Sequence, residues 1–320
     1  MINPPHGAAL KVIYIMGAGH IGSTILDLVL SSDPQIESLG EISKFHGYGW
    51  LPDENRHCAC GLTVYDCHFW ANVRKEWTEL ATNIDADRFM YLQPRYERTL
   101  TAWERLLRNR INRTGEFSEY LRGSEALYRA VERTGGKKYL VDSSLTPKRA
   151  YAQSLNPNID LYLIHLVRDG RGVIWSLMKP NKKIPAKVYI PAPPQRTTKY
   201  WISANLQSAW VFRNINPEKR KLIRYEDFAT NPSMVISQIG ELIGRDLSGL
   251  VKDAQLTNTN QVRHTVGGNR VRFQKDEEIR IRPDFAWMEN LPEKDRKLFW
   301  RRAGWLARRF GYMQHQVDYR

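Results

Sequence analysis

The feature that most constrains the fold is a glycine-rich turn, residues 17–24 (GAGHIGST), between two apolar segments. The segment before it, residues 11–16 (KVIYIM), is apolar and β-branched, which is typical of a buried parallel strand. The segment after it, residues 23–30 (STILDLVL), has apolar residues at helical spacing and stops at the turn SSDP. The sequence therefore predicts a strand, a glycine loop and a helix, whose backbone N–H groups point at one spot that suits an anion.

Similar units recur along the chain. We expect strands over residues 138–141, 161–167 and 221–225, helices over residues 148–155, 170–178 and 232–244, and a final amphipathic helix over residues 293–310. This alternation predicts one α/β domain over residues 1–320, with a parallel sheet covered by helices. Two stretches, near residues 45–72 and 179–200, lack a period, so we expect long surface loops there that bind a ligand.

The chain is strongly basic, with 48 Lys and Arg against 34 Asp and Glu and a net charge of +14. This balance indicates an anionic ligand, an acidic polymer or a nucleic acid. Residues 91–113 mix aromatic and basic side chains, but four of their apolar residues recur at helical spacing: Leu100, Trp103, Leu107 and Ile111. That spacing favours a core-facing stripe, so we expect no nucleic-acid partner.

The amino terminus and the hydropathy pattern bear on location. Residues 1–10 carry two prolines and no basic apolar run of the kind that begins a signal peptide. No apolar stretch approaches the roughly 20 residues that a spanning helix needs. We therefore expect a cytoplasmic protein with no integral membrane segment.

The glycine loop has the spacing of a Walker A motif, but Ser23 stands where nucleotide-hydrolysing families need lysine. That lysine normally reaches the β and γ phosphates, so triphosphate chemistry loses a main contact without it. A P-loop kinase or NTPase is therefore an alternative that the sequence disfavours. A donor with less charge at this position is indicated.

A second anion-binding segment, residues 166–176 (LVRDGRGVIWS), follows another expected strand. Arg168 is of a type that binds phosphate with two hydrogen bonds. Ser176 lies eight residues on, about two helical turns away, where its hydroxyl reaches the same anion. Each residue alone has an ordinary explanation, a salt bridge to Asp169 or a helix-surface serine.

Taken together, the two segments resemble sulfotransferases that use 3′-phosphoadenosine 5′-phosphosulfate (PAPS). GAGHIGSTIL resembles their 5′-phosphosulfate loop and HLVRDGRGVIWSL their 3′-phosphate motif. Further resemblances follow in the expected order: SLGEI at 38–42, VDSSLTPKRA at 141–150, RYEDFATNP at 224–232 and HTVGGNRVRF at 264–273. The CACG…DCHFW stretch, residues 58–70, is similar to a bacterial subgroup, and the closest branch is the one that modifies carbohydrates and protein tyrosines.

The resemblance implies a P-loop NTPase-like three-layer α/β fold with a central parallel sheet flanked by helices. It implies PAPS as the donor, 3′,5′-ADP as the product, and no metal. The residues that it assigns to the donor's phosphosulfate end are Gly19, His20, Ile21, Gly22, Ser23 and Thr24. Those that it assigns to the rest of the nucleotide are Arg168 and Ser176 on the 3′-phosphate, Tyr225 beside the adenine, and Gly267, Gly268, Asn269 and Arg272 as a second grip near the 3′-phosphate.

Two residues are candidates for catalysis. Glu41 matches the catalytic carboxylate of the related branch, so we expect it to be the general base that takes the acceptor proton during in-line transfer. His20 stands where relatives often carry Lys or Arg, and a histidine there donates a hydrogen bond or, when protonated, a charge. The reverse assignment, with His20 as the base and Glu41 orienting it, stays open.

Two departures from the family pattern bear on activity. Ile21 replaces a common serine, and Leu145 stands where the bacterial subgroup usually has a lysine that helps hold the sulfuryl group, unless Lys148 or Lys44 reaches in. A weakened protein of the same fold that binds acidic polymers is therefore a second alternative. For an active enzyme we expect a hydroxyl acceptor on a glycan or glycolipid, bound by the insertions near residues 45–72 and 179–200.

The three cysteines lie within ten residues, and their odd number indicates reduced thiols: Cys58, Cys60 and Cys67. With His57 and His68 they offer five metal ligands in twelve residues. Only one residue separates the first two cysteines, however, whereas closed zinc sites favour two to four. The sequence therefore favours a loop stabilised by packing of Phe69 and Trp70, and predicts no metal.

Overall fold

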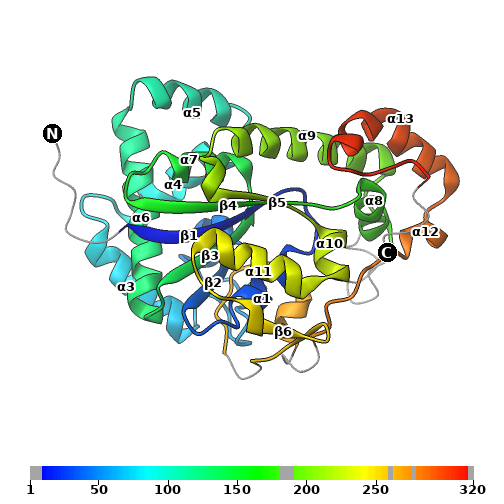
Figure 1. The fold of residues 1–320 in the computed structure, drawn as a ribbon. Helices are drawn as coiled ribbons and strands as arrows, with labels where there is room; N and C mark the ends of the chain where they lie inside the picture. The colour runs from blue at the N-terminus through cyan, green and yellow to red at the C-terminus, as the bar shows by residue number, and fades with distance from the viewer. Residues whose placement is uncertain (1–8, 180–190, 259–261, 275–278, 316–320) are drawn as a thin grey trace.

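The computed structural model describes residues 9–179, 191–258, 262–274 and 279–315. Its centre is a five-stranded sheet in the order β2-β3-β1-β4-β5, in which every neighbouring pair is parallel. The strands are β1 (Leu10–Met16), β2 (Ile36–Gly40), β3 (Tyr139–Leu145), β4 (Ile159–Val167) and β5 (Arg220–Arg224). This sheet, with helices on both of its faces, confirms the predicted α/β class (Figure 1).

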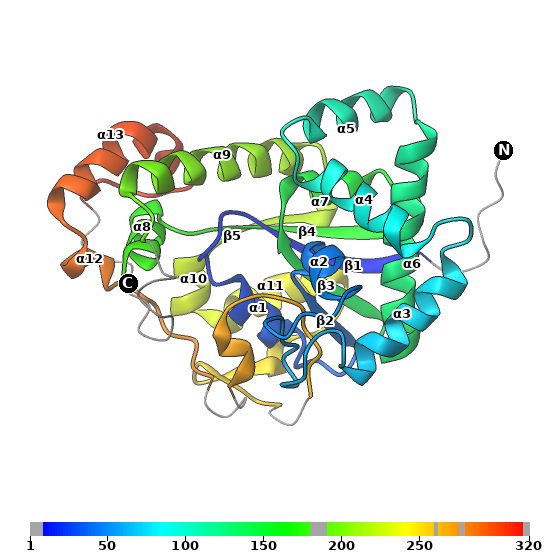
Figure 2. The same ribbon diagram turned by 180° about the vertical axis from the view of Figure 1, so that it is seen from behind.

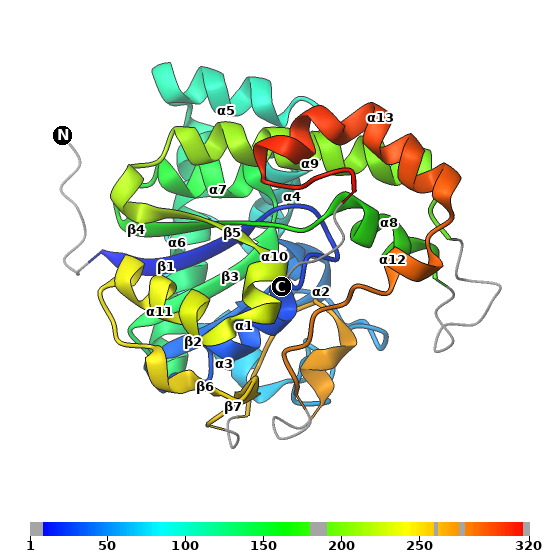
Figure 3. The same ribbon diagram turned by 45° about the vertical axis from the view of Figure 1, so that its right-hand side comes forward.

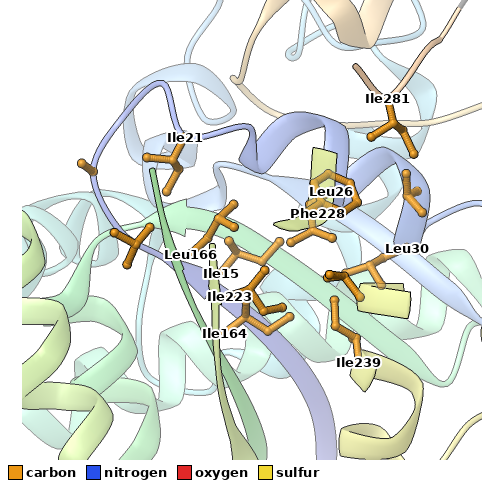
Figure 4. Close-up of a cluster of buried hydrophobic side chains, with 14 of the residues drawn as sticks. Ile15, Ile21, Leu26, Leu30, Ile164, Leu166, Ile223, Phe228, Ile239 and Ile281 are labelled. Carbon is orange, nitrogen blue, oxygen red and sulfur yellow. The ribbon is translucent and has the colours of Figure 1, made fainter. Parts of the chain in front are cut away.

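Successive side chains of β1 point to opposite faces of the sheet, and both faces are buried. Ile13 and Ile15 belong to one buried cluster, and Val12, Tyr14 and Met16 belong to another on the opposite face. Figure 4 shows the first cluster, in which strand isoleucines meet side chains from the helices. Burial on both faces is the reason that these strands are nearly continuous apolar runs.

The helices divide between the two clusters. The first face is covered by α1 (Ser23–Leu30), α10 (Tyr225–Thr230) and α11 (Pro232–Ile243), and the second by α3 (His68–Leu80), α4 (Ala86–Glu97), α6 (Gly115–Gly135) and α7 (Pro147–Ser154). Beyond the carboxyl end of β4 lie α8 (Gly170–Met178), α12 (Trp287–Asn290) and α13 (Glu293–Arg309). The long helix α9 (Pro194–Arg213) runs from there back along β4 to α7. In the part of the chain that is described, none of these helices is long and apolar enough to cross a bilayer.

Most of the expected elements are confirmed, but several expectations were incomplete or wrong. The short strand β2 was not anticipated. The stretch near residues 45–72, expected to be a surface loop, contains α2 (Phe45–Tyr48) and the start of α3, and several of its side chains, among them Phe45 and Trp70, are fully buried. The stretch near residues 179–200 contains the start of α9, while residues 180–190 lie outside the described residues.

The expected apolar stripe faces the core only in part: Trp103 of α5 (Ala102–Ile111) packs against the second cluster, whereas Leu100, which precedes the helix, is 98% and Ile111 91% exposed. The helix also packs through Ala102 and Leu106, which are fully buried.

A buried ionic cluster joins β3 to α7 and α4 on the second face. Arg149 of α7, fully buried, donates to Asp142 of β3 at 2.8 Å and to Glu97 of α4 at 2.5 Å. The hydroxyls of Tyr128 and Tyr120 donate to the same two carboxylates. Asp142 and Arg149 both come from the VDSSLTPKRA segment, so much of that motif serves to position β3 and α7.

Candidate functional site

The glycine loop lies at the carboxyl end of β1, where it passes close to α8 and α10 (Figure 3). Gly22, at the start of α1, has a left-handed backbone (φ 86°), and a Cβ there would lie 2.6 Å from the ring of Tyr225. A Cβ on Gly17 would collide with the carbonyl oxygen of Leu166. The loop therefore needs glycine at both positions in order to pack against β4 and α10.

Arg168 is brought to this loop from the end of β4. Its Nη1 donates to the carbonyl oxygen of His20 at 3.0 Å, and its guanidinium lies 4.4 Å from the centre of the Tyr225 ring. Its Nη2 donates to the carbonyl of Asp284 at 2.9 Å and pairs with that residue's carboxylate at 3.1 Å. The ordinary alternative, a salt bridge to Asp169, is wrong, because Asp169 pairs with Arg171 at 2.7 Å.

His20 and Ser176 connect the two predicted anion-binding segments. The Nδ1 atom of His20 lies 2.9 Å from Oγ of Ser176. The pKa of His20 is lowered, because loss of water around the ring disfavours its charged form and the cations Arg168 and Lys179 repel it, while Glu41 opposes the shift. His20 is therefore neutral near pH 7, with one ring nitrogen committed to Ser176.

The segment HTVGGNRVRF reaches the start of α1 from the other side. The backbone N–H of Asn269 donates to Oγ1 of Thr24 at 3.1 Å, and Gly268 lies against the same threonine. Arg272 donates to the carbonyls of Gly268 at 2.7 Å and His57 at 2.9 Å. The segment expected to be a second phosphate-binding element therefore lies beside the loop. The guanidinium of Arg272 stabilises the turn at Gly267 and Gly268.

Glu41 directly follows β2, and its charge acts on His20 of the loop, where it opposes the fall in pKa that burial causes. Its backbone N–H donates to the carbonyl of Val266 at 2.6 Å, and its carboxylate pairs with Lys44. A Cβ on Gly267 would lie 3.2 Å from Cβ of Glu41, so the glutamate touches the glycine turn. Glu41 therefore contacts the turn at Gly267, and its charge acts on His20 of the loop.

The departures from the family pattern have structural explanations. Ile21 is fully buried and packs in the first apolar cluster, so its side chain stabilises the loop from the core side (Figure 4). Leu145 has a left-handed backbone (φ 65°), packs against the same cluster and accepts a hydrogen bond from Gly17 at 3.2 Å. Lys148 donates to the carbonyl of Thr99, so of the two lysines considered as replacements only Lys44, which pairs with Glu41, lies beside a site residue.

Sequence reasoning missed two residues of the site. The hydroxyl of Tyr200, from α9, accepts a hydrogen bond from the backbone N–H of Gly19 at 2.6 Å. Desolvation raises the pKa of Tyr200, and the charge of Glu41 adds to this. Asp284 is the other missed residue, and no local pattern marks either of them, because their partners lie 181 and 116 residues away in the chain.

The arrangement as a whole is an anion cradle with one histidine and one carboxylate. Ser23, largely buried as the first residue of α1, and the loop residues before it present the amino end of a helix. Arg168 supplies a fixed cation on one side and Lys44 a cation beside Glu41. Such a site suits transfer of an anionic group between oxygens.

Neither a scan against protein-family models nor a search of the curated proteins gives a match. Solved structures do match. The sulfotransferase domain from the curacin biosynthetic pathway aligns with 94% of this chain and 99% of its own, with a TM-score of 0.50 and 18% identity. The sulfotransferase domain of the Synechococcus PCC 7002 olefin synthase covers 98% of both chains, with a TM-score of 0.49 and 16% identity. The first of these establishes the fold, which the chain shares with a sulfotransferase domain.

Proposed function

We propose that this chain is a PAPS-dependent sulfotransferase, which transfers a sulfuryl group from PAPS to a hydroxyl of an acceptor. The observation that carries the proposal is the meeting of two distant segments at one point. His20 of the loop contacts Ser176 at 2.9 Å and Arg168 at 3.0 Å, although about 150 residues separate them in the chain. The fold shared with the curacin-pathway domain supports the same reading.

The residues fit the two anionic ends of the proposed donor. The amino end of α1, with Gly19 to Thr24, suits the phosphosulfate, and a Cβ at Gly22 would fill the space beside Tyr225. Arg168 and Ser176 suit the 3′-phosphate. Asn269 and Arg272, expected as a second grip near that phosphate, lie instead beside Thr24 at the phosphosulfate end of the loop. We assign Tyr225 to the adenine side, where its ring also supports Arg168.

In the proposed reaction, the carboxylate of Glu41 takes the proton of the acceptor hydroxyl as that oxygen bonds to sulfur. The bond between sulfur and the phosphate oxygen breaks, and its electron pair leaves with 3′,5′-ADP. His20, neutral near pH 7, donates a hydrogen bond to the bridging oxygen in the tautomer that keeps the proton on Nε2. Lys44 pairs with Glu41. In the proposed reaction it helps to hold the sulfuryl group, which is the role of the lysine that Leu145 replaces.

We propose that the acceptor is a glycan or glycolipid and that the enzyme is cytoplasmic. The support is the carboxylate base and the +14 charge, which suits acidic acceptors. A P-loop kinase or NTPase is the alternative in another enzyme class, and Ser23 in place of lysine weighs against it. A weakened protein that binds acidic polymers is the alternative outside catalysis.

Calorimetric titration with 3′,5′-ADP and with ATP, followed by transfer of labelled sulfate from PAPS to a panel of glycans and phenols, tests the proposal. We expect binding of 3′,5′-ADP, no competition from ATP, and label on a glycan. Tight binding of ATP alone would favour the kinase. Nucleotide binding without label on any acceptor, even in a single turnover, would favour the binding protein.

A further inference from the structure

A compact group of three thiols and one imidazole lies close to the turn at Gly267 and Gly268. The ligand atoms of Cys58, Cys60, Cys67 and His264 all lie within 4.8 Å of one another. The Sγ atoms of Cys60 and Cys67 are 3.6 Å apart, and Nδ1 of His264 lies 3.2 Å from Sγ of Cys67 and 3.8 Å from Sγ of Cys58.

These separations match a tetrahedral metal centre better than a disulfide. Bond lengths of about 2.3 Å to sulfur and about 2.05 Å to nitrogen place ligand atoms about 3.8 Å apart for two sulfurs and about 3.6 Å apart for sulfur and nitrogen. A disulfide needs about 2.05 Å between sulfurs, and all three cysteines are free thiols. The four atoms are therefore spaced as the corners of one coordination shell.

The local structure aims the ligands at each other. The chain turns back after Cys58, with the N–H of Gly61 donating to the Cys58 carbonyl at 3.0 Å, which brings Cys60 toward Cys67 at the start of α3. The ring of His264 is stacked on Phe69, with centroids 4.8 Å apart and planes 2° from parallel. The imidazole is therefore held in one orientation, with Nδ1 directed at the thiols.

We propose that Cys58, Cys60, Cys67 and His264 bind one Zn²⁺ in a closed structural site. Three thiolates and one imidazole are a ligand set that favours zinc, and four protein ligands leave no position for a substrate. This proposal reverses the sequence-based prediction of no metal. The spacing of the cysteines along the chain does not reveal this ligand set, because the proposed fourth ligand lies 197 residues beyond Cys67.

The proposed metal joins the cysteine loop to the segment that carries the glycine turn (Figure 2). Cys58 forms an antiparallel bridge with Val266, and Val266 forms a parallel bridge with Gly40 at the end of β2. Val266 also accepts the hydrogen bond from the backbone N–H of Glu41. A metal at this point would therefore fix both Glu41 and the turn at Gly267 and Gly268.

Metal content can be measured without PAPS, so the outcome is independent of the proposed function. The full chain, purified without chelators, should contain one zinc per chain by elemental mass spectrometry. Replacement by Co²⁺ should give the visible absorption of a tetrahedral centre together with thiolate-to-cobalt charge-transfer bands. Protein that takes up no zinc from a buffer with excess Zn²⁺, or that isolates with a Cys60–Cys67 disulfide, would overturn the proposal.

Variants separate the proposed ligands from their neighbours. Cys67→Ser and His264→Ala should lose the zinc, whereas His264→Cys should keep it and strengthen the charge-transfer bands of the cobalt form. His68→Ala is the matched control, because this exposed histidine adjoins Cys67 but is not part of the cluster. Loss of zinc in His68→Ala with retention in His264→Ala would reject the ligand set. If the variants fail to fold, the cobalt spectrum of the unmodified chain decides the question.

Discussion

The imidazole of His20 and the hydroxyl of Ser176 lie 2.9 Å apart, so a hydrogen bond joins the loop after β1 to the helix after β4. Strands β1 and β4 are neighbours in the sheet, and their carboxyl ends lie at the same edge. Parallel strand pairing is therefore the physical reason that two segments so far apart in sequence form one site.

Arg168→Ala should weaken binding of 3′,5′-ADP by about 10- to 100-fold, the scale of one charge-assisted pair lost from a partly desolvated site. Calorimetry against the unmodified chain measures the change. Arg301→Ala, which removes an exposed arginine of α13, is the matched control and should leave the affinity unchanged. Equal affinities for Arg168→Ala and the control would remove Arg168 from the nucleotide site.

Asp284→Asn should strengthen binding of 3′,5′-ADP. The Asp284 carboxylate pairs with Arg168 at 3.1 Å and competes with a phosphate for the same guanidinium. Burial raises the pKa of Asp284, but Arg168 and Lys179 more than offset this, so the net shift is downward and the carboxylate is charged near pH 7. The gain should shrink as salt is added, which a titration series at rising ionic strength would detect. Weaker binding in the variant would mean that Asp284 holds Arg168 in place for the ligand.

Glu41→Gln should lower kcat by about 100-fold or more, the usual contribution of a general base, while affinity for 3′,5′-ADP stays within error. The pH-rate profile then distinguishes the two candidate bases. His20→Asn should retain the acid limb of the profile if Glu41 is the base, and lose it if His20 is. Since the pKa of His20 is lowered, a limb due to His20 would lie below its ordinary value of 6.5. Near-full turnover of Glu41→Gln with saturating PAPS would reject our assignment.

Asp27→Asn should flatten the dependence of stability on pH. Burial raises the pKa of Asp27 from 3.8 to about 7, although it accepts hydrogen bonds from Ser38 and Ser143. Between these values the folded chain keeps a proton that the unfolded chain has lost, so this contribution is full at low pH and disappears as pH rises toward 7. Its slope reaches at most about 1.4 kcal/mol per pH unit. Urea titrations at several pH values measure it, and an unchanged slope in the variant would exclude Asp27 as a source.

Arg149→Met should lower the free energy of unfolding by about 3–5 kcal/mol, because it leaves the carboxylates of Asp142 and Glu97 buried without their cation. Arg133→Met is the control, since this arginine is 53% exposed and its pair with Glu76 should contribute no more than about 1 kcal/mol. Chemical denaturation of the two variants gives the comparison. Similar losses of unfolding free energy in both variants would show that the buried ion pairs contribute no more to stability than an exposed pair does.

The proximity of Gly22 and Arg168 could be predicted from the sequence because both follow apolar strands closely, and the carboxyl ends of neighbouring parallel strands lie at one edge of the sheet. Assigning the two residues to one ligand depended on the resemblance to sulfotransferases. Tyr200, Asp284 and His264 were missed because each acts through a partner more than 100 residues away. Such contacts depend on tertiary packing, which periodicity does not encode.

Two errors in secondary structure have a related cause. Strand β2 (IESLG) carries Glu37 and Ser38, and it is buried only because β3 and α1 cover it. The expected stripe has helical spacing, but neighbouring helices contact α5 at Trp103 and Leu106 and leave Leu107 and Ile111 exposed. Periodicity predicts that a face exists and does not say which face the rest of the chain covers.

The bridge between Val266 and the end of β2 also affects whether the protein associates with other copies of itself. Strand β2 is at the edge of the sheet, where unpaired N–H and C=O groups are a template for strands of other molecules. Val266 receives the hydrogen bond from Glu41 and donates one to Leu39 at 3.0 Å, so it occupies part of that edge. A chain whose residues 264–267 come loose would expose these groups, and self-association would then accompany any loss of activity.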